Sequence, residues 1–485
     1  MESLQKAVIM KKISNEKELC IILALTSFIF FNFLILSLTI LSYPYDLDIT
    51  EGFLLIPSIK ILQGKGLYTD IHSPPYYFIE KYPPIFYSFN TLTMIFFGTN
   101  LFSARIISFI SSLLIGLVIL LIMKKKTNNK LLQLSAFLFF FSSYVIIQIA
   151  TQVRVDALGS LFSLLGIYFI MDYKKKKNFY LAIVFFLASI FTKQTFLAAS
   201  LASFLYIFME DKKKSIKFLT FIIIPTIAFF SLINFLSNGQ FIFHVLKSSA
   251  GIIEPSIQFL FSRLSGSLII ICIGIYFFLK NRKDILSLYF LFSLIILIVQ
   301  FTRTGAWINY LFELTAIASI FPFLLIKNIN LKTGKVFIIF LLILQIFIFV
   351  KNDPRSMSFI IWPNSYTPNI NVNSDEKISS YVKNSTGNIL VEHATFAIIN
   401  KKEIPPELWS IIELEQLNII NNSEIINFVK NQNYSMIIYY KKDRVPQIKD
   451  LNEYILKNYK LIDEIPWVDQ AFHNETWKVY KNKME

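Results

Sequence analysis

The chain has 485 residues, 54% of them hydrophobic, with 50 phenylalanines but only 14 glycines, and its formal net charge is +15. This composition excludes an ordinary soluble protein and indicates a chain whose main solvent is lipid. The positive excess lies before residue 351, because residues 1–350 carry 31 Lys and Arg against 15 Asp and Glu, whereas residues 351–485 carry 16 against 17. The lysines form short clusters between apolar runs, which the positive-inside rule explains without a nucleic-acid partner: 124–126, 174–177, 212–214 and 280–283.

The first apolar run predicts an uncleaved membrane helix. Leu19 to Leu41 contains no charged residue over 23 positions, follows four lysines and leads to no small-residue cleavage site. It is too long for the apolar core of a signal peptide, so we expect a cytoplasmic N-terminal tail (1–18). Cys20 and Cys272 both lie inside apolar runs, and we therefore expect neither a disulfide framework nor a thiolate metal site.

Further runs without charge predict a polytopic α-helical protein of about 11–13 transmembrane helices. The long runs are 103–123, 131–150, 216–236, 263–279, 285–302, 304–326 and 336–350, and the shorter ones are 83–98, 157–171, 178–192 and 194–209. We expect a multi-pass protein of the plasma (inner) membrane.

Placing the lysine clusters in the cytoplasm puts the loop 43–82 and the chain from residue 351 onward on the extracytoplasmic side. An odd number of crossings is then required between Lys81 and Lys124, although two apolar segments lie there. One of those segments is therefore expected not to cross the membrane fully.

The first external loop carries three carboxylates within six residues, Asp46, Asp48 and Glu51, directly after a membrane span. Acidic residues favour a helix N-terminus, so the cluster is explained either by capping of the short helix that follows or by a functional site. As a site, it would supply a general base or bind a divalent cation at the lipid surface. A divalent cation is the only cofactor that the sequence suggests.

The same loop ends in Glu80-Lys81-Tyr82-Pro83-Pro84, where the prolines disfavour a helix. Lys81 either binds an anion or extends to the membrane interface, which is the commoner behaviour of such lysines.

More ionisable and polar residues interrupt or flank later apolar runs: Arg154, Asp156, Lys193, Arg303, Asn309 and Glu313. Asn309 and Glu313 are four residues apart, hence on one helix face, and Glu313 lies well inside an apolar run. Cations and carboxylates on one membrane face suit an anionic substrate with a lipid tail. They suit an ion or sugar pathway almost as well, although no inverted hydropathy repeat supports a transporter.

The C-terminal part predicts a linker (351–373) and a small extracytoplasmic α/β domain (374–485). Helical patterns near 375–383, 423–430 and 450–458 alternate with strand patterns near 388–392, 435–440, 459–465 and 475–480. His393 and His473 are isolated in the sequence and do not predict a metal site. We expect this domain to cover the active face, to present the acceptor, or to act as a structural cap.

Taken in order, several short motifs resemble the opening of the protein O-mannosyltransferase and aminoarabinose-transferase superfamily of C-fold glycosyltransferases. They are Asp48, Glu51-Gly52, Gly64, Glu80-Lys81-Tyr82-Pro83-Pro84, Phe97-Gly98 and Ala104-Arg105. Arg154-Val155-Asp156 and Thr192-Lys193 resemble its arginine-x-aspartate and threonine-lysine turns, and Asn309-Tyr310-x-x-Glu313 resembles an element of its bacterial members.

The resemblance implies a transmembrane glycosyltransferase domain (19–350) that moves a sugar, with inversion, from a polyprenyl-phosphate donor to a glycan, lipid or protein acceptor. The residue matching Asp48 would be the general base, with Asp46 and Glu51 as alternatives because the superfamily's adjacent aspartate-glutamate pair is absent here. The implied phosphate ligands are Lys81, Arg154, Lys193 and Arg303, and the other substrate contacts are Glu80, Tyr82, Asp156, Asn309, Tyr310 and Glu313. A lipid-linked glycan flippase or polymerase and a sugar transporter are the alternatives.

Overall fold

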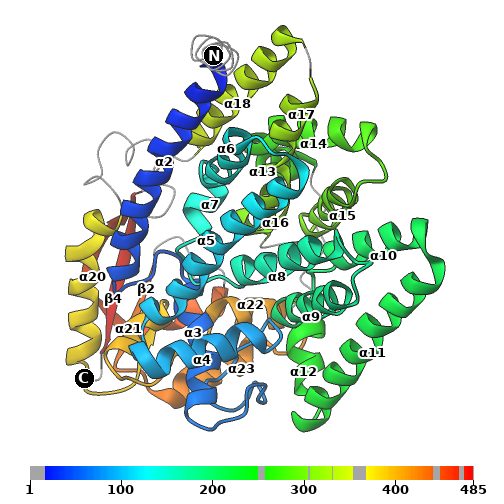
Figure 1. Ribbon diagram of the computed structural model, residues 1–485. Coiled ribbons are helices and arrows are strands. Elements are labelled where there is room, and N and C mark those ends of the chain that lie inside the picture. The colour runs from blue at the N-terminus through cyan, green and yellow to red at the C-terminus, as the bar shows by residue number, and fades with distance from the viewer. Residues whose placement is uncertain are drawn as a thin grey trace.

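The computed structural model describes residues 17–248, 257–303, 306–329, 331–352, 367–440, 448–468 and 474–483. In this part of the chain the fold is mostly helical, with a four-stranded sheet near the C-terminal end (Figure 1). The expected N-terminal tail up to residue 16, most of the expected linker (353–366) and His473 lie outside the described residues.

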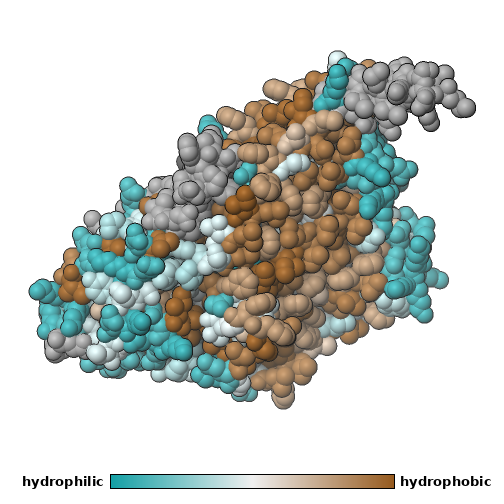
Figure 2. All heavy atoms as spheres, turned by 60° about the vertical axis from the view of Figure 1, so that its left-hand side comes forward, coloured by the Kyte–Doolittle hydropathy of each residue, from teal (hydrophilic) through white to brown (hydrophobic). Residues whose placement is uncertain are grey.

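Six described helical segments are long and apolar enough to cross a membrane. They are α2 (Lys17–Ser42), α5 (Leu101–Lys126), α11 (Lys212–Leu236), the stretch Leu260–Lys280 that includes α14 (Leu268–Lys280), the stretch Ile308–Asn328, and α18 (Lys332–Asn352). Shorter apolar helices are α4 (Ile85–Phe97), α6 (Lys130–Phe141), α8 (Val155–Ile170), α10 (Ala198–Glu210) and α15 (Ile285–Gln300). Figure 2 shows the result, a broad apolar belt between hydrophilic surfaces.

Serines interrupt two of the predicted spans. The run 131–150 is divided into α6 and α7 (Tyr144–Ile149) at Ser142, whose hydroxyl donates to the Phe139 carbonyl at 2.7 Å. The run 304–326 is divided into η4 (Ile308–Tyr310), α16 (Leu311–Ala318) and α17 (Phe321–Asn328), and Ser319 donates in the same way to the Ala316 carbonyl. Such local side-chain bonds compete with helix continuation and leave no trace in apolar periodicity.

The lysine clusters lie together on one face of the protein. Lys125 pairs with Asp172 at 2.8 Å, Lys126 pairs with Asp284, and Lys174 lies 3.3 Å from Glu210. These pairs connect all four clusters, because Asp172, Asp284 and Glu210 each lie within three residues of the next cluster. We call this surface the lysine face.

The geometry of α4 resolves the crossing problem between Lys81 and Lys124. α4 has 13 residues, so it is about 20 Å long and shorter than the ~30 Å hydrocarbon layer. At the start of α5, Arg105 donates to the Ile40 and Tyr43 carbonyls at the end of α2, whereas α5 ends in the lysine face. Both ends of α4 therefore lie on the side of the first loop, and only α5 crosses.

The C-terminal sheet combines β1 (Ile389–Val391), β2 (Met436–Tyr440), β3 (Tyr459–Val468) and β4 (Asn474–Asn482) in the order β1-β2-β4-β3. β1 pairs with β2 in parallel, and the other pairings are antiparallel. Helices α20 (Thr367–Asn384), α23 (Asn422–Gln432) and α25 (Lys449–Asn458) confirm the predicted alternation, while α21 (Ala394–Ile399) and α22 (Leu408–Gln416) were not predicted. α20 begins inside the expected linker, since proline is tolerated in a first helical turn.

The first loop and this C-terminal region share apolar cores. Ile71, Tyr77 and Ile79 of the loop pack with α22, α23 and β2, and Phe53 of α3 (Thr50–Leu62) packs with Ala394 of α21. At Gly52, a Cβ atom would lie only 2.4 Å from the Thr395 hydroxyl, so α21 approaches the backbone of α3 directly. The C-terminal region is thereby fixed onto the first loop (Figure 1).

Candidate active site

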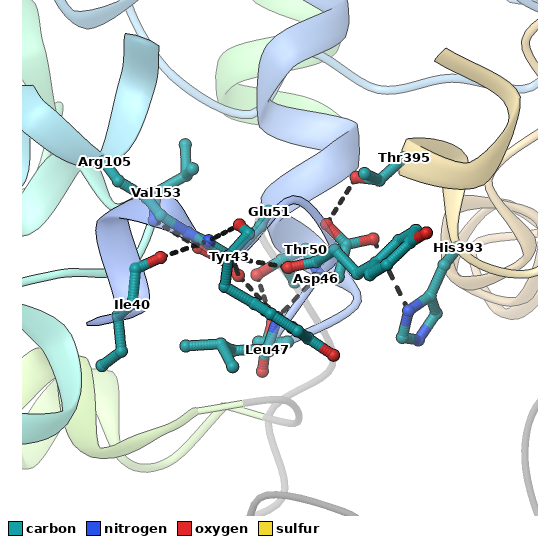
Figure 3. Close-up of polar contacts among 12 residues, drawn as sticks. Ile40, Tyr43, Asp46, Leu47, Thr50, Glu51, Arg105, Val153, His393 and Thr395 are labelled. Atoms are coloured by element: carbon teal, nitrogen blue, oxygen red, sulfur yellow. Dashed lines mark hydrogen bonds and ion pairs between the residues drawn. The ribbon is translucent and has the colours of Figure 1, made fainter. Parts of the chain in front are cut away.

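Glu51 and Arg105 form a fully buried ion pair that shapes the first loop. Arg105 Nε and Nη2 donate to the two carboxylate oxygens of Glu51 at 2.9 and 2.7 Å, and neither side chain is exposed. The same carboxylate accepts the backbone N–H groups of Leu47 and Val153. Figure 3 shows this arrangement. These four hydrogen bonds occupy the acceptor positions of the Glu51 carboxylate and hold the loop against α5 and the chain near residue 153.

Asp46 is also buried, but it faces the C-terminal region. Thr395 donates to Asp46 Oδ1 at 2.5 Å, and His393 Nδ1 lies 3.5 Å from Oδ2 (Figure 3). Burial raises the pKa of Asp46 well above its usual range, and the neighbouring Glu51 raises it further. His393, isolated in the sequence, is thus not isolated in the fold.

Asp48 is the most exposed of the three loop carboxylates. Its side chain is 21% exposed, and its Oδ1 lies 3.0 Å from Arg154 Nη2. The Thr50 backbone N–H donates to the same oxygen at 2.9 Å, which fixes the carboxylate at the start of α3. Arg154 precedes α8 and is buried, and its Nε meets no acceptor among the described residues. This pair therefore combines a carboxylate open to solvent with an unused buried donor.

A second ion pair lies beside the first. Lys193 Nζ lies 2.8 Å from Asp156 Oδ1, and Asn309 Nδ2 donates to Asp156 Oδ2 at 3.1 Å. The Lys193 ammonium also lies over the Tyr310 ring, 4.2 Å from its centroid, and 5.9 Å from that of Tyr82. Residues from the first loop, α8, the end of α9 (Lys176–Thr192) and η4 thus meet at one place.

The length of α8 gives the distance between this site and the lysine face. α8 runs from the site at Val155 to Ile170, close to Asp172 of the lysine face, in 16 residues. That length is about 24 Å, less than the ~30 Å hydrocarbon thickness. The site therefore lies closer to the lysine face than the thickness of the hydrocarbon layer.

Lys81 connects the first loop to the C-terminal region. Its ammonium pairs with Glu413 Oε2 of α22 at 2.7 Å, and Trp409 Nε1 donates to Glu413 Oε1 at 2.7 Å. Gln194, next to Lys193, donates to the Lys81 carbonyl at 3.2 Å. Lys81 is thus adjacent to the Lys193 turn, and its partner comes from a helix that the sequence did not predict.

Glu80 belongs to a buried network of contacts that fixes the backbone of the first loop. It pairs with buried Lys60, and its backbone N–H donates to His244 Nδ1 at 3.2 Å. His244 Nε2 donates in turn to the Thr69 carbonyl at 2.7 Å. This buried network fixes the backbone immediately before Lys81.

Two other candidate residues make no ion pair within the described part of the chain. Glu313 accepts a hydrogen bond from the Tyr289 hydroxyl at 2.9 Å and has no ion pair within the described residues. Arg303 lies between α15 and η4, and within the described chain it makes no ion pair. No contact described here joins Glu313 or Arg303 directly to Asp48.

The loop carboxylates do not fit a divalent cation well. Glu51 is saturated by Arg105 and two backbone donors, Asp46 accepts from Thr395, and Asp48 faces Arg154. No group of three or more metal-ligating side chains with suitable geometry occurs in the described part of the chain. We therefore assign no chemical step to a metal.

Sequence reasoning missed the partners that come from distant segments. Lys60 and His244 are single residues without a motif, and Thr395 and Glu413 lie more than 300 positions from their partners in the first loop. In the sequence, only the superfamily motif Ala104-Arg105 drew attention to Arg105.

Comparisons with known proteins fit this geometry. The sequence profile of the family described as dolichyl-phosphate-mannose-protein mannosyltransferase matches residues 81–238. ArnT from Cupriavidus metallidurans bound to undecaprenyl phosphate superposes with a TM-score of 0.60 at 10% identity, covering 96% of this chain and 98% of that chain. The chain has the fold of the C-type glycosyltransferases. The superfamily resemblance predicted from the sequence motifs is thereby confirmed.

Two further structures share this C-type fold. ArnT from the same organism in the apo state gives a TM-score of 0.61 at 10% identity, covering 92% of this chain and 96% of that chain. The Archaeoglobus fulgidus oligosaccharyltransferase in the apo form gives 0.50 at 10% identity, covering 89% and 70%. No curated protein sequence matches significantly. Together the family and fold support a membrane protein with glycosyltransferase activity in general.

Proposed function

We propose that this protein transfers a sugar from a polyprenyl-phosphate donor to an acceptor hydroxyl on the extracytoplasmic side, with inversion and with Asp48 as the general base. The donor class is supported by the family description and by the undecaprenyl phosphate bound to the ArnT structure. In the proposed orientation the lysine face is cytoplasmic, so the first loop and the C-terminal region are extracytoplasmic.

The observation that carries the proposal is the Asp48–Arg154 pair. Asp48 is partly exposed and fixed by the Thr50 N–H, whereas the Nε donor of buried Arg154 has no acceptor among the described residues. A buried donor without an acceptor costs free energy, and a phosphate oxygen of the donor would satisfy it. Asp46 and Glu51 are buried, whereas the Asp48 side chain is 21% exposed, which favours Asp48 among the three candidates.

The chemistry requires one proton transfer and one displacement. Asp48 accepts the proton of the acceptor hydroxyl while that oxygen attacks the anomeric carbon from the face opposite the phosphate. The bond between the anomeric carbon and the phosphate oxygen breaks, and the polyprenyl phosphate leaves with the bonding electrons. Attack from the opposite face inverts the anomeric configuration.

Basic residues stabilise the departing phosphate in this scheme. Arg154 lies two residues before Asp156, the partner of Lys193, and Gln194 joins the Lys193 turn to the Lys81 backbone. We assign the phosphate to Arg154, Lys193 and Lys81, and we add Arg303 on its sequence motif alone. Asn309 and Tyr310 orient Asp156 and Lys193, while Tyr82 lies near the same ammonium. Glu80 and Glu313 act through neighbouring residues, and the acceptor is a glycan, lipid or protein.

The test is acceptor-dependent release of free polyprenyl phosphate from a panel of polyprenyl-phosphate sugars by purified protein in lipid. Asp48→Asn should lower this release about 100-fold or more, the usual contribution of a positioned base, while donor binding is retained. Lys81→Ala should weaken donor binding.

Glu51→Gln serves as the comparison, because it removes a buried structural carboxylate and should reduce folded protein together with activity. Full activity of Asp48→Asn would refute its assignment as the base. Absence of release with every donor and acceptor, together with movement of labelled lipid or sugar across the bilayer, would replace the transferase by a transporter.

A further inference from the structure

The three cations assigned to the phosphate are each paired with a carboxylate. Arg154 pairs with Asp48, Lys193 with Asp156, and Lys81 with Glu413. The first two partners come from the first loop and α8, within the transferase motifs. Glu413 alone comes from the C-terminal region, on α22. Arg154 still has its Nε donor for a phosphate oxygen, but a phosphate that takes the position of a carboxylate at Lys193 or Lys81 must displace that carboxylate.

The Lys81–Glu413 pair is the one most open to exchange. The Lys81 and Glu413 side chains are 25% and 17% exposed, against 10% and 21% for Arg154 and Asp48 and 4% and 2% for Lys193 and Asp156. Asp156 is additionally held by Asn309, and Asp48 by the Thr50 N–H. Ion pairs contribute less net stability as their exposure rises, so displacing Glu413 costs less than displacing the buried Asp156.

The surroundings of this pair limit the exchange to side-chain rotation. Glu80 is fixed by Lys60 and His244, and the Lys81 carbonyl accepts from Gln194, so the backbone at Lys81 is held. On the other side, Leu408, Ile411 and Leu414 of α22 are buried in the core shared with the first loop. Neither backbone needs to move for Glu413 to turn away from the lysine.

We propose that Glu413 occupies the place of the donor phosphate at Lys81, so that the phosphate must displace it and the C-terminal region sets donor affinity. Trp409 holds Glu413 in this position through its indole N–H. This inference rests on the proposed donor class, and it makes Glu413 a determinant of donor affinity rather than a catalytic residue.

The test is equilibrium binding of radiolabelled undecaprenyl phosphate to the full-length protein in nanodiscs. Glu413→Gln removes the competing charge and should tighten binding about fivefold, the scale of one exposed ion pair. Glu415→Gln removes a charge from the same helix, and since Glu415 makes no ion pair with a described residue it should bind like the wild type. Undecaprenol, which lacks the phosphate, should bind all variants equally.

A double-mutant cycle isolates the pair. On a Lys81→Ala background, Glu413→Gln should no longer change the affinity for undecaprenyl phosphate, because the contested cation is absent. Trp409→Phe, which keeps Glu413 but removes its hydrogen-bond donor, should tighten binding by a smaller factor. This variant keeps the test informative if Glu413→Gln folds poorly.

The outcomes separate this inference from the proposed reaction. Unchanged or weaker binding by both Glu413→Gln and Trp409→Phe overturns the competition, even where sugar transfer is normal. Tighter binding by Glu413→Gln without any sugar transfer supports the competition while refuting the transferase. Equal tightening by Glu415→Gln overturns the specific role of Glu413, because general charge would then explain the effect.

Discussion

At the scale of single residues, environment separates three carboxylates that look equivalent in the sequence. Asp46, Asp48 and Glu51 lie within six positions, yet Glu51 is saturated, Asp46 is buried against Thr395, and Asp48 is partly exposed. The sequence identified the cluster but not the division of roles, because the deciding partners, Arg105, Arg154 and Thr395, come from three other segments.

The buried Glu51–Arg105 pair leads to a stability prediction. Glu51→Gln leaves the Arg105 guanidinium buried without its counter-ion, and this should lower the free energy of unfolding by about 3–5 kcal/mol. Denaturant-induced unfolding of the purified protein in detergent measures the change.

Asp48→Asn is the matched control, since it removes a carboxylate of the same loop at a partly exposed pair. Its pair is partly exposed, at 10% for Arg154 and 21% for Asp48, so this variant should lower the free energy of unfolding by clearly less than Glu51→Gln does. Equal destabilisation by both variants would contradict the structural role assigned to Glu51.

At the scale of elements, the close contact of α3 with α21 depends on one glycine. Gly52→Ala places a Cβ atom 2.4 Å from Thr395 Oγ1 and 2.7 Å from Thr395 N, so α21 must shift. We expect a loss of about 1–3 kcal/mol of stability and faster limited proteolysis of the C-terminal region.

Gly66→Ala is the control in the same loop, because its Cβ would meet only Thr69 Cγ2 at an ordinary 3.6 Å. It should resemble the wild type in both measurements. If Gly52→Ala behaved in the same way, the close approach of α21 to α3 would be wrong.

The elements themselves were largely predictable, and the exceptions have physical reasons. Runs without charge gave α2, α5, α11 and α18, since length and apolar character alone decide such helices. The breaks at Ser142 and Ser319 depend on single hydrogen bonds. That α4 does not cross is visible only from the bond of Arg105 to the Ile40 carbonyl, which places the start of α5 beside the end of α2. Apolar periodicity carries neither kind of information.

At the scale of the whole molecule, a buried aspartate links the C-terminal region to the end of α2. Asp375 of α20 accepts from Trp467 Nε1 at 2.9 Å and contacts the Tyr43 hydroxyl. Burial raises the pKa of Asp375 from 3.8 to about 7, against the smaller opposing effect of these hydrogen bonds. The folded protein therefore retains this proton over a range in which the unfolded chain loses it.

The sign of the pH effect follows from this difference. Below pH 4 Asp375 is protonated in both the folded and the unfolded state, so its raised pKa does not lower the stability. Between about pH 4 and 7 Asp375 ionises only in the unfolded state, and the free energy of unfolding therefore falls as the pH rises. Asp375→Asn should remove this part of the slope. Thermal unfolding of wild type and variant across pH 4–8 measures it, and parallel curves would contradict the assignment.

The alternation of helices and strands in the C-terminal region was predictable, but its position on the first loop was not. Contacts such as Thr395 with Asp46 and Lys81 with Glu413 join segments more than 300 residues apart. No local pattern encodes such pairs, and in this chain they determine which loop residues remain accessible.

The shortness of α8 affects which measure of donor concentration sets the occupancy of the site. Because its 16 residues place the site about 24 Å from the lysine face, less than the hydrocarbon thickness, the proposed lipid-linked donor would reach it by lateral diffusion within its leaflet. The quantity that sets occupancy is then the number of donor molecules per unit of bilayer area. Diluting vesicles with buffer would leave the turnover of each protein unchanged, whereas diluting the donor with other lipids would lower it.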